Sequence, residues 1–212
     1  MTTQTITTAA VGRASAPPDE VDLRFSATAI EPDVTSARRA VAEQATLLRQ
    51  VLDETGVPED RIRTDQFHIR QRSPDRGSPS TQDQPFHATE RISVTLLDLD
   101  RLGETLSAAV DEAGVEIDEV GFTFQTETQR ELQREAIADA VETARMKATA
   151  AATAEEMTVG DVRSIVTDDG SRPRRTSAGQ QLAMDTAESG SVDSGPIEIQ
   201  VRVEVEYELT SS

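Results

Sequence analysis

The sequence predicts an α+β fold, with helices packed on one face of a mixed or antiparallel sheet. Short stretches in which apolar and polar residues alternate predict strands, and longer stretches with apolar residues three and four positions apart predict amphipathic helices. These stretches follow the order strand, helix, strand, strand, helix, strand, the split βαβ arrangement written βαββαβ. Residues 53–62 and 111–120 share five of ten positions, which indicates a repeat; chance similarity between two helix ends is the alternative.

The first half of this predicted core begins with a half-buried strand over residues 21–29, where apolar and polar side chains alternate. A helix follows, with Asp33 as its N-cap residue, and it ends at Gly56. Residues 61–72 form the second predicted strand. We expect a bulge in this strand, because Ile62 is out of phase with the apolar residues that follow it.

The second half starts after a long polar connection, residues 73–85, which is rich in proline and predicts a loop. A third strand is predicted over residues 86–96. Asp98 then caps a second helix that Gly114 closes, and the fourth strand covers residues 117–124.

The last third adds a long helix and two strands to the core. Thr126 and Gln129 predict a capping box at the start of an alanine-rich helix. A short strand is expected over residues 162–167, after Gly160, and then a polar loop over residues 168–195. The apolar stripe of the helix consists of Leu132, Ile137, Val141, Ala144, Ala148 and Ala151.

The C-terminal strand, residues 197–209, has the most regular alternation in the chain, with one apolar face and one acidic face. It is longer than a small sheet needs. We expect its surplus to pair either with an N-terminal strand around Ile6 or with a neighbouring subunit, because each arrangement covers an edge that otherwise invites aggregation.

The charge of the chain excludes several kinds of partner. With 39 acidic and 21 basic residues the net charge is −18, so we expect no binding to nucleic acid or to anionic membrane surfaces. We also expect no membrane insertion, because no stretch of the sequence approaches the 18 or so apolar residues of a membrane span. Lys147 is the single lysine, and such acidic, lysine-poor chains are typical of salt-adapted halophiles, which favours an archaeal source. Binding of cations or of a basic partner is the alternative explanation of the acidity.

Few residues offer chemistry. The chain lacks cysteine, and no nucleophile or phosphate-loop motif is present, so we expect no enzymatic activity, no catalytic residue and no cofactor. His68 and His87 flank the predicted 73–85 loop and could form a weak metal or pH-sensing site if their strands make a hairpin. Exposed, unpaired histidines are the alternative.

Four segments together resemble the SIMPL-domain family. They are Ser15–Val21 before the first strand, Thr55–Thr64 after the first helix, Val94–Gly103 before the second helix, and Arg134–Ala148 in the long helix. The family includes periplasmic oxidative-stress-defence proteins and immunogenic surface or periplasmic proteins of bacteria, and no enzymatic activity is attached to it as a family. This member has no recognisable signal peptide or transmembrane segment, so we expect a cytoplasmic protein.

The resemblance implies one SIMPL domain over residues 1–212. Its expected parts are a βαββαβ core over 5–125, a long helix and strand over 126–167, a flexible loop over 168–195, and the C-terminal strand over 196–210. It also implies a non-enzymatic homo-oligomer or interaction protein with a protein partner, and a link to stress defence as in its relatives. A domain that binds a small ligand or a metal through its polar strand face and long loops is the alternative.

We expect dialysis from molar KCl into low-salt buffer to unfold the protein or dissociate its oligomer. Repulsion among its carboxylates is screened within about 3 Å in molar salt but acts over much longer distances in dilute buffer. Circular dichroism and light scattering would measure both effects. A fold and an oligomer that survive at low salt would contradict the halophilic interpretation.

Overall fold

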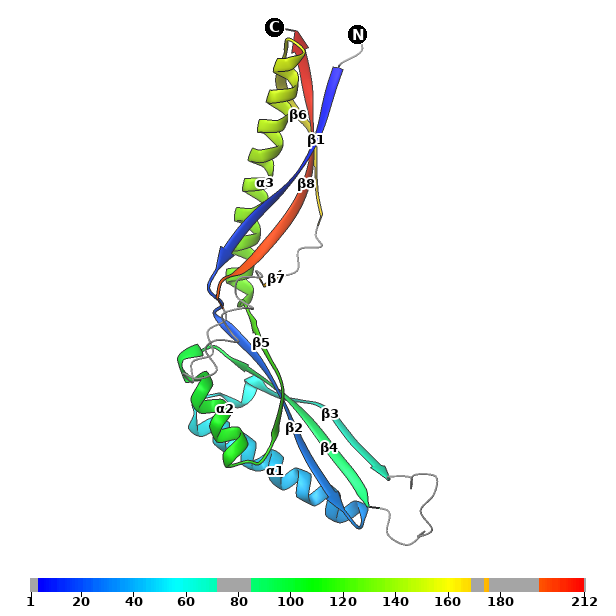
Figure 1. Cartoon of the computed structure of the whole chain (residues 1–212), viewed down its shortest axis with the longest axis vertical. Coiled ribbons are helices and arrows are strands. Elements are labelled where there is room, and N and C mark those ends of the chain that lie inside the picture. Colours follow the sequence, from blue (N-terminus) through cyan, green and yellow to red (C-terminus); the bar gives the residue numbers. More distant parts are fainter. Residues whose placement is uncertain (1–3, 72–84, 169–173, 176–194, 212) are drawn as a thin grey trace. The chain divides into compact units, whose positions relative to one another are not determined.

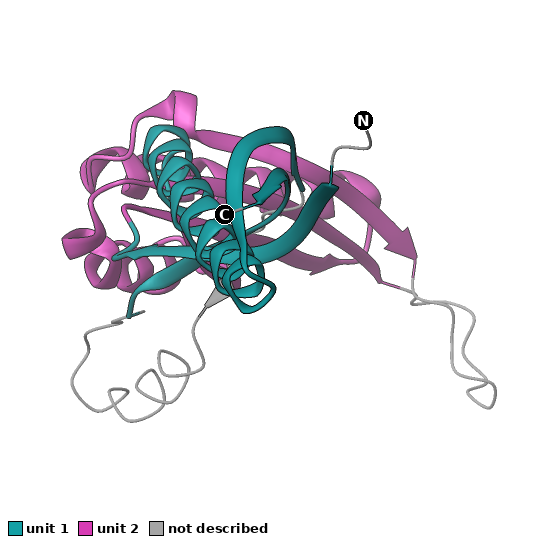
Figure 2. Ribbon diagram, turned by 90° about the horizontal axis from the view of Figure 1, so that it is seen from above, with its two compact units in different colours: residues 1–18, 124–185, 193–212 teal, residues 19–123, 186–192 magenta. Residues whose placement is uncertain are grey.

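The computed structural model of the chain describes residues 4–71, 85–168, 174–175 and 195–211 (Figure 1). The predicted loops over 73–85 and 168–195 therefore lie, apart from their ends and a two-residue strand, outside the described residues. Backbone contacts divide the described chain into two compact units (Figure 2). Unit 2 contains residues 19–123, and unit 1 contains the described residues on either side of it.

Unit 2 contains a four-stranded antiparallel sheet with the order β3-β4-β2-β5. The elements follow the predicted βαββαβ order, which confirms the α+β class. They are β2 (Glu20–Glu31), α1 (Val34–Glu54), β3 (Ile62–Gln71), β4 (Phe86–Leu96), α2 (Leu102–Asp111) and β5 (Glu116–Thr123). Short 3-10 turns, Glu59–Arg61 and Leu99–Arg101, precede β3 and α2.

The core of unit 2 lies between this sheet and its helices. Val21, Leu23 and Phe25 of β2 are buried because their side chains alternate toward the helix face. The predicted N-cap of α1 is confirmed, since Asp33 Oδ1 accepts the backbone N–H groups of Thr35 at 2.9 Å and Ser36 at 3.0 Å. The hydrogen bond from the Ser36 N–H is the main cause that holds the pKa of Asp33 below its ordinary value.

Two irregularities shape the sheet of unit 2. The register of β3 against β4 shifts between Thr64 and Gln66, which confirms the predicted bulge. A second shift, between Arg24 and Phe25 where β2 meets β5, was not expected from the sequence. It leaves Asp118 without an opposite residue in the ladder, so the side chain of Asp118 is free to turn toward β2.

Unit 1 is built from the two ends of the chain and the long helix. β1 (Gln4–Ala16) pairs antiparallel with β8 (Ile197–Ser211) over the full length of β1, so the first of the two predicted pairings occurs. β6 (Met157–Thr167) pairs with the other edge of β8, beside the two-residue β7 (Arg174–Arg175). These strands form a second sheet rather than extending the first, and α3 (Thr126–Ala154) lies along one face of it (Figure 1).

The contact between α3 and β1 corrects the predicted stripe. Ile137 and Val141 are only half-buried and Ala151 is exposed. A Cβ atom at Gly12 would lie 2.0 Å from the Ala136 carbonyl oxygen, so the helix backbone rests directly on the strand and only small side chains fit between them. The buried stripe recurs every fourth residue and consists of Leu132, Ala136, Ala140, Ala144, Ala148 and Ala152.

The predicted capping box of α3 is wrong. Gln125 is the N-cap residue and makes no side-chain capping bond. Its carbonyl accepts the backbone N–H of Gln129 at 2.9 Å, so the helix starts one residue earlier than the capping box requires. Within the described parts of both units, no helix is long and apolar enough to cross a membrane.

We expect Gly12→Ala to destabilise unit 1 by about 3 kcal/mol or more, because the added methyl group meets helix backbone that cannot move aside. Thermal unfolding followed by circular dichroism measures the loss. Gly160→Ala in β6 is the matched control, since a Cβ atom there has its nearest neighbour at 3.4 Å. Equal melting temperatures for the two variants would show that the close approach at Gly12 is not a constraint.

Candidate functional site

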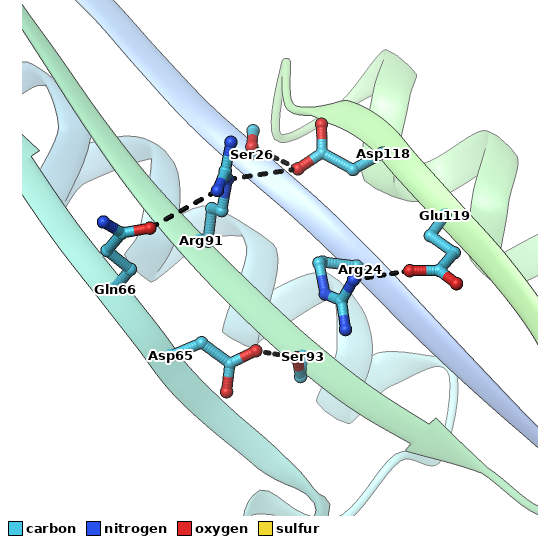
Figure 3. A network of polar contacts seen from close by, with 8 residues as sticks. All are labelled: Arg24, Ser26, Asp65, Gln66, Arg91, Ser93, Asp118 and Glu119. Atoms are coloured by element: carbon cyan, nitrogen blue, oxygen red, sulfur yellow. Dashed lines mark hydrogen bonds and ion pairs between the residues drawn. The ribbon is translucent and has the colours of Figure 1, made fainter.

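The first candidate surface is the face of the unit 2 sheet opposite α1 and α2. Figure 3 shows polar side chains from all four strands on it. Arg91 on β4 lies 3.3 Å from the Gln66 side-chain oxygen on β3 and 3.7 Å from an Asp118 carboxylate oxygen on β5. Ser26 on β2 donates to the same carboxylate at 2.6 Å. One cluster of side chains thus ties the four strands together across this face.

Two further pairs lie on the same face. Arg24 Nη1 is 2.5 Å from Glu119 Oε2, and the Ser93 hydroxyl donates to the carboxylate of Asp65 (Figure 3). The hydrogen bond from Ser93 is the main cause that lowers the pKa of Asp65, and Arg63 lowers it further. These groups are exposed, so their pairs contribute little to stability and leave the face available to a polar partner.

A cavity of about 500 Å³ opens on this face. It has the size of a small-molecule site but a polar lining in which both charges occur. Such a lining suits a small molecule that itself carries both charges. The charged residues around it are Arg24, Arg61, Arg63, Asp22, Asp60, Asp65 and Glu119.

The structure places the two histidines on neighbouring strands of this face. His68 is opposite Thr89 and His87 is opposite Arg70, so the imidazoles occupy diagonal positions. Arg70 Nε donates a hydrogen bond to Nε2 of His68. This bond occupies a nitrogen that could otherwise bind a metal, and it places the positive charge of Arg70 beside the imidazole. Within the described residues, no group of three or more histidine and carboxylate side chains is placed to hold a metal ion. Arg70 was not among the residues predicted from the sequence, although its alternation with His68 puts both on one face.

The second candidate surface is the outer edge of β6 in unit 1. β8 pairs with one edge of β6, and no described strand pairs with the other. Val162 and Ile165 are 44% and 49% exposed, and Val166 is more exposed still. A cavity of about 560 Å³ lies beside the start of this strand, lined by Met157, Val159 and residues of α3. An open strand edge with exposed apolar side chains is the usual template for adding another strand.

The outer edge of β1, at the other side of the same sheet, is different because side chains of α3 cover it. The Arg13 backbone N–H donates to an Asp139 carboxylate oxygen at 2.9 Å. The ammonium group of Lys147, the single lysine, donates to the Ala9 carbonyl at 3.0 Å. Two of the backbone groups that another strand would need are therefore already bonded, which leaves β6 as the more accessible edge of this sheet.

Glu20, at the start of β2, supplies a pH-dependent test of unit 2. Burial, and then the neighbouring carboxylates Asp22 and Asp19, raise the pKa of Glu20 above 4.5, while Arg61 lowers it in part. A raised pKa means that the folded state disfavours the ionised form, so the penalty is present at neutral pH and vanishes as the pH falls below 4.5.

We therefore expect Glu20→Gln to raise the melting temperature at neutral pH and to leave it unchanged below pH 4.5. Glu135→Gln, on the exposed side of α3, is the control for removing one negative charge from the chain. Thermal unfolding across this pH range measures both. An effect of Glu20→Gln that is no larger than the control at neutral pH would contradict the assignment.

Comparison with the curated proteins finds no match to the chain. Two solved structures of AtUAH, in complex with glyoxylate and with (S)-hydroxyglycine, match 54% of this chain and 27% of their own at 15% identity, with TM-scores of 0.26 and 0.25. The matched part is about a quarter of those proteins, and at such TM-scores we draw no conclusion from them.

The family comparison covers both units. The model of the family described as "SIMPL: Protein of unknown function (DUF541)" matches residues 6–207, from β1 to β8, and the chain therefore belongs to the SIMPL family.

Proposed function

We propose that this SIMPL protein is a non-enzymatic assembly or interaction protein that forms homo-oligomers through the outer edge of β6. The observation that carries the proposal is the exposure of Val162, Ile165 and Val166 on a strand whose outer edge no described strand covers. Burying these side chains removes apolar surface from water, and each hydrogen bond formed by the open edge satisfies backbone groups that now face solvent.

The local charge of β6 supports the same surface. The chain carries a net charge of −18, so two copies repel each other over most of their surfaces. Between Met157 and Thr167 the sequence has one acidic residue, Asp161, and one basic residue, Arg163. An interface at this strand therefore brings together two segments without net charge, rather than two acidic ones.

Binding of a small ligand at the unit 2 cavity is the second candidate function. The mixed charges of Arg24, Arg61, Asp22 and Asp60 around about 500 Å³ favour a polar molecule that carries both charges. This function does not need an oligomer, so the two candidates predict different behaviour in solution. A cytoplasmic location and a link to stress defence remain predictions.

We expect size-exclusion chromatography with light scattering in molar KCl to give a mass of two or more chains, with dissociation on dilution. Melting temperatures measured with a panel of zwitterionic small molecules form the second arm. A monomer whose melting temperature rises with one of these compounds would favour the ligand-binding function. A monomer at every concentration would contradict assembly.

A further inference from the structure

We propose that two copies of the chain pair antiparallel through the outer edges of their β6 strands, with the two-fold axis at Val162. The proposal rests on the proposed assembly function and names its partner, a second copy, and its register. Three independent features of β6 support it: the faces of its apolar side chains, the positions of its bulges and the order of its charges.

Three apolar side chains of β6 share one face, whereas Val166 stands opposite Glu204 and points to the other. Val159, Val162 and Ile165 stand opposite Leu209, Tyr207 and Val205 of β8, respectively. Tyr207 and Val205 are buried on the side of the sheet that α3 covers, so the three β6 side chains point to that side. The helix reaches less far over the edge strand, which leaves Val162 and Ile165 about half exposed.

The bulges explain why these residues are three positions apart rather than two, and one bulge lies on each side of Val162. The register of β6 against β8 shifts once between Val159 and Val162 and again between Val162 and Ser164. Each shift inserts one extra residue. Bulges in an edge strand usually hinder pairing because the edge becomes irregular. A two-fold axis through Val162, however, places the bulge before Val162 in one strand against the bulge after Val162 in the other, so each irregular segment faces another irregular segment.

The charges are complementary in this register alone among the nearest ones. With the axis at Val162, Asp161 of each copy stands opposite Arg163 of the other, and Val159 stands opposite Ile165. Directly opposite side chains in antiparallel strands have Cβ atoms about 4.5–5.5 Å apart, close enough for an ion pair. Moving the axis by one residue to Asp161 or Arg163 sets two like charges directly opposite each other.

The pairing also uses groups that the fold leaves accessible. Arg163 Nε lies 3.3 Å from Glu208 Oε1 of its own chain, on the face away from α3, with its side chain about half exposed. Glu208 lies on β8, on the inner side of β6, so the guanidinium exchanges this exposed contact, which contributes little to stability, for Asp161 of the second copy. The alternating apolar and charged pattern is self-complementary, which favours a second copy over an unrelated extended peptide.

A charge exchange tests the register. In Asp161→Arg the new arginine faces Arg163 of the partner at both pairs, and we expect the dissociation constant of the dimer to rise at least tenfold. Arg163→Asp should weaken it similarly, and the double variant Asp161→Arg/Arg163→Asp should restore it. Light scattering is measured at the lowest KCl concentration that keeps the circular dichroism spectrum native, since salt screens these pairs.

A cysteine cross-link tests the axis. Because the chain lacks cysteine, Val162→Cys introduces a single thiol that faces its own copy, at a separation that a disulfide can span. We expect mild oxidation to give a covalent dimer within minutes at micromolar protein. Val110→Cys, on α2 and exposed to 43% against 44% for Val162, is the matched control and should stay monomeric.

The outcomes separate this proposal from the one it rests on. Suppose that the protein is an oligomer, but that Val162→Cys cross-links no faster than Val110→Cys and the charge variants leave the dissociation constant unchanged. This result would overturn the β6 pairing and leave assembly through another surface. A wild-type chain that stays monomeric would overturn both. A cross-link together with rescue by the double variant supports the pairing.

Discussion

The ladder between β1 and β8 is the interaction on which unit 1 depends. It joins the two ends of the chain from Gln4 opposite Leu209 to Ala16 opposite Ile197, without a register shift. The regular ladder gives both strands a mostly apolar face, and α3 packs on that face. The helix comes nearest to β1 at Gly12, where no side chain separates the two backbones.

The position of α3 then decides which edge of the sheet stays open. The helix lies close to β1, so Asp139 and Lys147 reach backbone groups of that strand and block its outer edge. Because α3 lies nearer to β1 than to β6, it covers β6 less, and Val162 and Ile165 are exposed. The exposure of Val162 and Ile165 thus agrees with a helix that packs closest to Gly12 of β1, at the other side of the sheet.

Local sequence signals predicted part of the structure correctly, although they failed at the capping box of α3 and at Asp98, which makes no side-chain capping bond. The N-cap at Asp33, the bulge in β3 and the alternation in β8 depend on neighbouring residues and are confirmed. The stripe of α3 failed at Ile137 and Val141 because its phase is set by contact with Gly12, about 130 residues away in the chain. Periodicity alone favours large apolar residues, whereas close packing selects the small ones.

The candidate surfaces likewise have some features that follow from local alternation and others that depend on contacts between distant parts of the chain. Alternation predicted that His68 and His87 share a polar face, but the diagonal register and the bond from Arg70 depend on pairing between strands. The outer edge of β6 was not predicted, because the sequence signal is a strand and the openness of an edge depends on which neighbours are present.

Salt affects the two electrostatic terms of the proposed pairing unequally. Repulsion between two chains of net charge −18 is a sum over many separated carboxylates, so it falls steeply when the screening length drops from about 10 Å at 0.1 M salt to about 3 Å at 1 M. The attraction between Asp161 and Arg163 acts at contact and loses a smaller share. The burial of Val162 and Ile165 does not depend on charge. An acidic chain with a neutral strand edge is therefore suited to associate in concentrated salt and to separate in dilute buffer.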